Sequence, residues 1–363
     1  MAIGKSKSFS RTLFLTLFIL AVFVTVASFL LVLLMGYGFV FFTSEGVALS
    51  MQSGAFPVLL FLFLIVFYTP PLPIGTVFGL IWIVYVVCFV AAWKWRESFH
   101  SVVSKSFSRP FRSLFSNFLF IMPLISSMVL TAAWAIISSQ EFVGVPTGQP
   151  IFPPEMPQQE VFLNLAYAPV IEELGFRLIP IGLFIMFYVF LYGKKSTSGG
   201  FKPFVASILY PEGAKRMVGL RNVSEHGFWR GISGGEWAMV LVTSVVFAFA
   251  HIISGIGWEP GKVTSVFVQG FFFAVTYLAY GFEAPILLHW FFNYYLFFFD
   301  PDILSKFFPA TDPILTLVEL VILGLGVAGW VAFAIVGLRK LIRRPEKEQM
   351  PPVPVSPQAT FAS

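Results

Sequence analysis

The chain has 363 residues, of which 57% are hydrophobic and 11% are charged. Soluble globular proteins carry about 25% charged residues, so this composition excludes an ordinary soluble domain and indicates a polytopic membrane protein. The net charge of +5 does not predict nucleic-acid binding, because the basic residues lie in loops beside apolar runs, as the positive-inside rule requires. The single cysteine, Cys88, excludes an internal disulfide and a thiolate metal site.

Apolar runs follow one another along the chain and predict its membrane helices. They cover residues 13–42, 56–68, 77–93, 114–137, 161–192, 237–253, 263–280, 285–299 and 314–338. The run 56–68 is the shortest and leads into a proline cluster, so we expect it to re-enter the membrane rather than cross it. The predicted fold is therefore all-α, a polytopic transmembrane helix bundle of about eight spanning helices.

Charged residues between the runs predict the orientation of this integral, multi-pass membrane protein. Basic residues gather in 94–112, in 193–230 and in the tail after 338, which places the basic loops and the C-terminal tail in the cytoplasm. The segment 193–230 is rich in Gly and Ser, which argues against a separate folded domain and leaves room for a helix on the lipid surface. The tail turns Pro-rich and is predicted to be disordered.

The fifth run contains the sequence Glu172-Glu173-Leu174-Gly175-Phe176-Arg177. An ionisable residue inside a membrane helix costs roughly 2.5–3.5 kcal/mol on insertion scales, so each one needs a polar cavity or a partner. Glu173 and Arg177 are spaced i, i+4 and predict an ion pair. Glu172 points about 100° away from Glu173 and is left without that partner. Taken alone, the pattern fits a structural ion pair equally well.

Two later runs add polar residues to the predicted bundle interior. His251 ends the sequence Phe247-Ala248-Phe249-Ala250-His251, and His289 and Asn293 are spaced i, i+4 in the run 285–299. A single histidine on an apolar face is usually a packed residue. Because polar residues interrupt three separate apolar runs, we expect them to converge on one water-accessible cavity. These residues are Glu172, His251, His289 and Asn293.

The motifs EExxxR, FxxxH and HxxxN, in this order on successive helices, resemble the CAAX protease and bacteriocin-processing (CPBP) family. The resemblance is to its type II CAAX prenyl endopeptidases, which are intramembrane glutamate proteases. It covers a predicted protease core at 114–299, after N-terminal membrane helices and a basic loop at 1–113. A last membrane helix follows at 300–338, and then the tail at 339–363.

The resemblance implies that Glu172 and His251 hold and deprotonate a water. His289 and Asn293 would form an oxyanion hole, and Glu173 and Arg177 would support the helix that carries Glu172. It also implies a site open to the cytoplasm. The expected partners are membrane lipid and a peptide or lipidated protein substrate, with no nucleic acid. Nothing in the sequence decides whether the substrate is prenylated.

Three alternatives stay open. The two glutamates and two histidines could bind zinc, which is the second choice of cofactor after none at all. Arg177 argues against zinc, because its fixed charge neutralises Glu173 and repels a divalent cation. An ion-coupled transporter would use the same intramembrane charges, although no internal repeat is visible. A non-catalytic scaffold or immunity protein could retain the bundle for binding alone.

Overall fold

The computed structural model of the protein describes residues 2–62, 64–148, 156–193, 200–254, 257–298 and 312–342. Seven helical stretches in this part of the chain are long and apolar enough to cross a membrane. They are Arg11–Phe41, Ile74–Lys105, Phe118–Phe142, Gln158–Tyr192, Gly234–Ile253, Lys262–Tyr280 and Leu315–Arg339. Together with the shorter helix α14 (Glu283–Phe298), they form a polytopic helical bundle of about eight spans, which confirms the predicted fold class.

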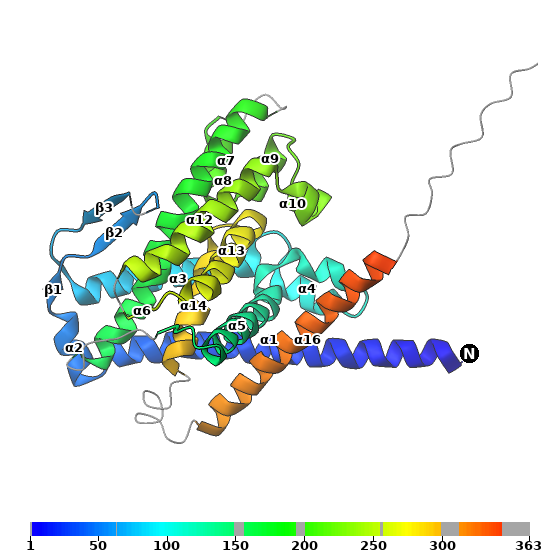
Figure 1. Ribbon diagram of the computed structural model, residues 1–363, viewed down its shortest axis with the longest axis horizontal. Helices are drawn as coiled ribbons and strands as arrows, with labels where there is room; N and C mark the ends of the chain where they lie inside the picture. Colours follow the sequence, from blue (N-terminus) through cyan, green and yellow to red (C-terminus); the bar gives the residue numbers. More distant parts are fainter. Residues whose placement is uncertain are drawn as a thin grey trace, which may run out of the picture.

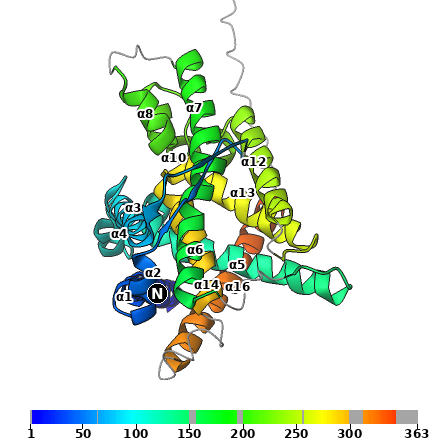
Figure 2. The same cartoon turned by 90° about the vertical axis from the view of Figure 1, so that its left-hand side faces the viewer.

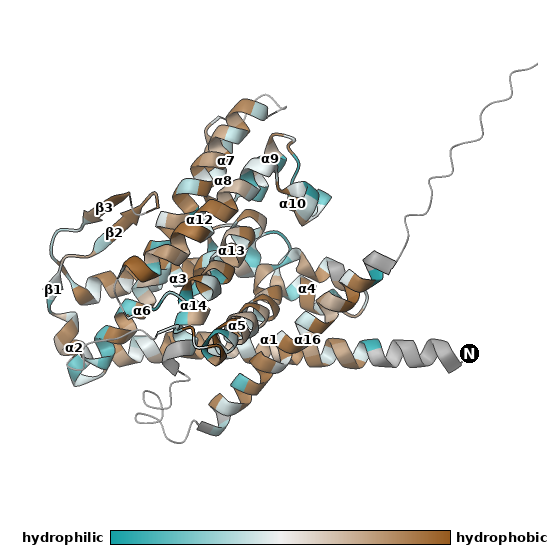
Figure 3. Cartoon of the chain, viewed as in Figure 1, coloured by the Kyte–Doolittle hydropathy of each residue, from teal (hydrophilic) through white to brown (hydrophobic). Residues whose placement is uncertain are grey.

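The long helices follow the apolar runs closely. They are α1 (Ala2–Phe41), α3 (Ile74–Lys94), α5 (Phe118–Phe142), α6 (Gln158–Glu173), α7 (Ile179–Tyr192), α12 (Gly234–Ile253), α13 (Lys262–Tyr280), α14 and α16 (Asp312–Ile342). Figure 1 shows α1 along the base of the molecule, crossed by α16, with α12, α13 and α14 grouped above. Hydrophobic residues predominate along the long helices, as expected for membrane spans (Figure 3).

Helices α6 and α7 form one long element, seen upright in Figure 2, that is interrupted in the middle. Residues Leu174–Leu178 form a π-helical turn in which the Ile179 N–H bonds to the Leu174 carbonyl, five residues earlier. The next residue is Pro180, which has no N–H to give to the preceding turn. This register shift follows Glu173 directly, and single π-turns inside α-helices are frequent at functional sites.

The run 56–68 is not a helix. It forms an antiparallel hairpin of β2 (Pro57–Leu60) and β3 (Ile65–Tyr68), after the short helix α2 (Ser44–Ser50). Two further strands, β1 (Ser53–Gly54) and β4 (Leu72–Pro73), pair at its base. The prolines at both ends of the run disfavour a helix there and suit strand ends. The run is therefore not a spanning helix, and its re-entry into the membrane stays a prediction.

The described part of the basic segment after α7 contains four short helices. Residues 200–233 include α8 (Lys202–Leu209), α9 (Pro211–Met217), α10 (Val223–His226) and α11 (Phe228–Gly231). Glu212 accepts hydrogen bonds from the N–H groups of Val223 and Ser224, both at 2.8 Å. Helices α8 and α9 pack on α7, and α9 also packs on α13. The expectation that this segment is not a separate folded domain stays a prediction.

A buried ion pair joins this segment to α12. Lys215 Nζ donates to Glu236 Oε1 at 2.7 Å, to Glu236 Oε2 at 3.0 Å and to the Gly231 carbonyl at 2.6 Å. Glu236 also accepts from the Ser233 N–H at 2.6 Å, closing a capping box at the start of α12. The last predicted helix appears as α16. The predicted tail and most of the acidic connection before α16 lie outside the described residues.

Candidate functional site

Glu173 is the polar centre of the site. Its carboxylate is fully buried, and Oε1 accepts from Arg177 Nη1 at 2.9 Å and from His289 Nδ1 at 2.8 Å. The i, i+4 pair predicted from the sequence is therefore formed, and it has a third member from α14. Because a carboxylate can only accept, the hydrogen of the His289 ring in this contact is on Nδ1.

Glu172 differs from its neighbour in both exposure and partners. Its side chain is 23% exposed, whereas that of Glu173 is 0% exposed. Glu172 Oε2 lies 3.8 Å from His289 Nε2, which is beyond hydrogen-bond distance. His289 therefore lies between the two glutamates, bonded to the buried one through Nδ1 and facing the accessible one through Nε2.

Aromatic rings surround the positive charge of the site. The Arg177 guanidinium lies 4.1 Å from the ring centre of Phe247 and 5.3 Å from that of Phe273. The Phe273 ring stacks on His289 at 5.0 Å. Gly270 allows this close packing, since a Cβ there would lie 2.9 Å from Arg177 Nη2 and 3.0 Å from Phe247 Cδ1. The Arg177 guanidinium is thus surrounded by aromatic rings, whose faces attract a positive charge.

His251 approaches the same cluster from the end of α12. Its Nδ1 lies 2.9 Å from the Phe247 carbonyl oxygen one turn earlier, and its ring lies 4.7 Å from the Phe247 ring. A carbonyl only accepts, so this contact places the hydrogen on Nδ1 and leaves Nε2 as the basic nitrogen of the neutral ring. Phe247 also packs against His289, at 5.7 Å between ring centres, so one aromatic ring lies between the two histidines.

Asn293 has a structural contact that sequence reasoning did not foresee. Its Nδ2 donates to the Leu165 carbonyl on α6 at 3.0 Å. In a regular helix that carbonyl would accept from residue 169, which here is Pro169 and has no N–H. Asn293 therefore satisfies an acceptor freed by a proline, and the second N–H of its amide stays available.

The described residues contain no group of three or more His, Cys, Asp or Glu side chains placed to hold a metal ion. Glu173 in particular already bonds to Arg177 and His289. The other buried oxygen of Glu173, and Nε and Nη2 of Arg177, have no hydrogen-bond partner among the described residues. The charged cluster is thus incompletely paired, which is costly unless the site has a use for it.

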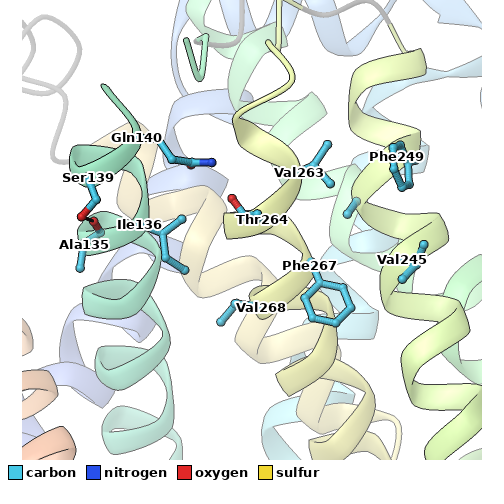
Figure 4. Close-up of a pocket in the computed structure, with 11 residues that line it drawn as sticks. Ala135, Ile136, Ser139, Gln140, Val245, Phe249, Val263, Thr264, Phe267 and Val268 are labelled. Carbon is cyan, nitrogen blue, oxygen red and sulfur yellow. Dashed lines mark hydrogen bonds between the residues drawn. The ribbon is translucent and has the colours of Figure 1, made fainter. Parts of the chain in front are cut away.

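A groove of about 660 Å³ lies between α5, α12 and α13, apart from the charged cluster. Apolar side chains such as Ile136, Val245 and Phe267 line it, with Gln140 and Thr264 among its few polar groups (Figure 4). None of the six residues predicted for the site lines it. The groove is chemically suited to a hydrocarbon chain and offers no group for hydrolysis.

Residues 156–295 match the family model described as type II CAAX prenyl endopeptidase Rce1-like. This part of the chain is an Rce1-like domain. The matched segment contains all six predicted site residues and lies within the predicted core. The family is one of CAAX-type endopeptidases, and the match together with the seven apolar helices supports an integral membrane protein. No curated protein and no solved structure matches the chain.

Within this Rce1-like domain, sequence reasoning missed the residues that hold the charges in place. Phe247 was visible as the first residue of the FxxxH motif, but only the structure shows it between Arg177 and both histidines. Phe273 and Gly270 lie on α13, which carries no motif residue and gave no signal. The contact between His289 and Glu173 depends on the packing of α14 on α6, which spacing alone does not specify.

Proposed function

We propose that this protein is a CAAX-type intramembrane endopeptidase in which Glu172 and His251 activate a water molecule. One observation carries the proposal. Of two adjacent glutamates, Glu173 is buried and bonded to Arg177 and His289, whereas Glu172 is partly exposed. One carboxylate therefore holds the site together and the other is available to remove a proton from water.

The proposed reaction uses the remaining groups in separate roles. His251 Nε2 accepts a hydrogen bond from the water while Glu172 takes its proton, and the hydroxide attacks the peptide carbonyl carbon. The oxyanion receives hydrogen bonds from the Asn293 amide and from His289, once His289 carries a hydrogen on Nε2 as well as on Nδ1. Glu172 then gives its proton to the leaving nitrogen, which restores the free carboxylate.

A charge balance supports the role of His289. If Glu172 and Glu173 are ionised, Arg177 supplies one positive charge and a doubly protonated His289 would supply the second, so these four side chains together would be neutral. Neutrality matters because an uncompensated charge in a membrane interior costs several kcal/mol. This state would also point an Nε2–H donor towards the space beside Glu172.

The proposed substrate is a membrane-associated peptide, a prenylated C-terminal tail being the form that the family name suggests. The proposed chemistry needs no metal. Arg177 bonds to Glu173, one of the two carboxylates that a zinc site could use, and an asparagine amide is a poor zinc ligand but a good donor to an oxyanion. An open zinc site of Glu172, His251 and His289 is the alternative. A site opening towards the cytoplasm and cytoplasmic basic loops remain part of the same proposal.

The test is cleavage of a peptide library, with and without a farnesylated cysteine, by purified protein in liposomes. We expect Glu172→Gln to lower the rate by about 10²–10⁴, the usual contribution of a general base. Glu160→Gln, a change of the same kind in the first turn of α6, should keep wild-type activity. Equal activity of both variants would contradict the assignment of Glu172.

The same preparation separates the rival functions. Activity that survives a strong chelator supports metal-free hydrolysis, whereas activity lost on chelation and restored by zinc would make this a zinc protease. Peptide binding without cleavage in the wild type would favour a scaffold or immunity protein. Peptide-independent, Glu172-dependent proton or ion flux in the same liposomes would favour a transporter.

A further inference from the structure

The hairpin of β2 and β3 is attached directly to the π-turn that follows the two glutamates. The Leu62 N–H, in the hairpin turn, donates to the Gly175 carbonyl at 2.9 Å. That carbonyl is free because the π-turn sends the Ile179 N–H to Leu174 instead. Gly175 follows Glu172 by three residues, so the tip of the hairpin is bonded to the backbone about one helical turn from the proposed catalytic residue.

The edge of β2 is occupied by the same helix. The Tyr167 hydroxyl donates to the Pro57 carbonyl at 2.6 Å. The Leu59 carbonyl oxygen packs against Gly175, where a Cβ would lie only 2.9 Å from it. Pro57 has no N–H to leave unpaired. The hairpin therefore uses one of its two edges to bind α6 and the π-turn.

The edge of β3 has no such partner. Thr69 donates to the Phe56 carbonyl at 2.9 Å, and an antiparallel ladder alternates bonded and non-bonded pairs. With Val58 opposite Phe67, this alternation directs the N–H and C=O of Val66 and Tyr68 outward. Neither residue's backbone has a further hydrogen bond within the described chain. In Figure 1, β3 lies on the outer side, with β2 between it and the helices.

The environment of this edge is apolar. Val66 is 44% exposed, Tyr68 is 70% exposed, and the chain has no charged residue between Glu45 and Lys94. Most residues of both strands accordingly have the brown colour of hydrophobic residues in Figure 3. Proteins normally protect an exposed edge with a charge, a proline or a bulge, and β3 has none of these. Unpaired peptide groups in apolar surroundings are costly, and an extended backbone is the partner that satisfies them.

We infer that β3 binds the peptide substrate as an added strand and delivers it to Glu172. This inference rests on the proposed endopeptidase function and names the form in which the substrate is held. An extended peptide is also the form that hydrolysis requires, since a helix occupies its carbonyl oxygens with internal hydrogen bonds. Main-chain hydrogen bonds to β3 supply affinity with little demand on substrate sequence.

The first test changes the outward N–H of β3 without touching the hairpin ladder. Val66→Pro removes that donor, and proline is tolerated at an outward-facing edge position. We expect KM for a short farnesylated peptide to rise about tenfold, the effect of one backbone hydrogen bond, with kcat within about twofold of wild type. Val66→Ala, which keeps the N–H, should change KM by less than about twofold.

The second test leaves the enzyme unchanged and moves an N-methyl group along the substrate peptide. Strand addition predicts that methylation weakens binding at every second residue, since alternate N–H groups face β3. A loss at every position, or at none, would overturn the inference, even if Glu172→Gln abolishes cleavage. Failure of the wild type to cleave any peptide would instead remove the proposed function itself.

The competing occupant of this edge is a second copy of the chain. If β3 pairs with its equivalent in another molecule, Val66→Pro should convert a dimer to a monomer without changing KM. Light scattering of the detergent-solubilised variants measures this directly. That outcome would overturn substrate binding at β3.

Discussion

The buried pair Lys215–Glu236 and the buried group Glu173–Arg177–His289 differ in how completely their polar atoms are bonded. The ammonium of Lys215 makes three hydrogen bonds, and both oxygens of Glu236 accept. In the other group, Glu173 Oε2 and two nitrogens of Arg177 have no partner in the described part of the chain. Both groups are buried, so they differ in how many of their polar atoms are hydrogen-bonded and not in their exposure to solvent.

This difference indicates a structural role for the Lys215–Glu236 pair and a functional role for the Glu173–Arg177–His289 group. A fully bonded ion pair fixes one arrangement and is costly to break, as suits the joint between α9 and the start of α12. An ion pair with unbonded donors and acceptors can still form hydrogen bonds with a ligand, at a cost in stability. This is typical of a site that acts on a ligand. Mutation of the Lys215–Glu236 pair should therefore lower mainly stability, whereas mutation around Glu173–Arg177–His289 should lower mainly activity.

The largest expected effect is on stability, from Lys215→Met. The change leaves Glu236 buried without its counter-charge, and breaking a buried pair costs about 3–5 kcal/mol of unfolding free energy. Reversible unfolding in mixed micelles measures the loss, while activity per folded molecule should not change. The double variant Lys215→Met with Glu236→Leu should recover much of the stability. A loss of activity in fully folded Lys215→Met would break the comparison.

The next effect is on rate, from Asn293→Ala. Loss of one oxyanion donor lowers kcat by about 10²–10³. The same change also leaves the Leu165 carbonyl unbonded, so stability should fall by about 1–3 kcal/mol. Adding Pro169→Ala supplies a backbone N–H for that carbonyl. If the double variant regains stability but not activity, Asn293 acts on the reaction; recovery of both would limit it to the structural contact.

The smallest effect is expected from Gly270→Ala, which crowds Arg177 and Phe247. Overpacking of this kind lowers the unfolding free energy by about 1–3 kcal/mol. We also expect the displaced Arg177 guanidinium to weaken the hydrogen bond between Glu173 and His289. Activity should fall more than stability alone explains. Gly324→Ala on α16 is the matched control, because a Cβ there meets nothing within 4 Å. Equal behaviour of the two variants in stability and activity would contradict the packing argument.

The sequence by itself determined the membrane class, the positions of the long helices and the i, i+4 pair of Glu173 and Arg177. These depend on local hydrophobicity and on helical spacing, which are readable along the chain. Three short motifs in a fixed order also indicated the family whose model matches residues 156–295. The sequence did not distinguish the roles of Glu172 and Glu173 beyond their different directions on the helix.

Only the tertiary structure decided which groups meet. The contact of His289 with Glu173 joins residues 116 positions apart and depends on how α14 packs against α6. The bond from the hairpin to Gly175 uses a carbonyl released by a π-turn, for which periodicity gives no signal. A buried Lys–Glu pair formed across 21 positions joins α9 to the start of α12. Such long-range contacts are set by packing, because neither composition nor local propensity specifies them.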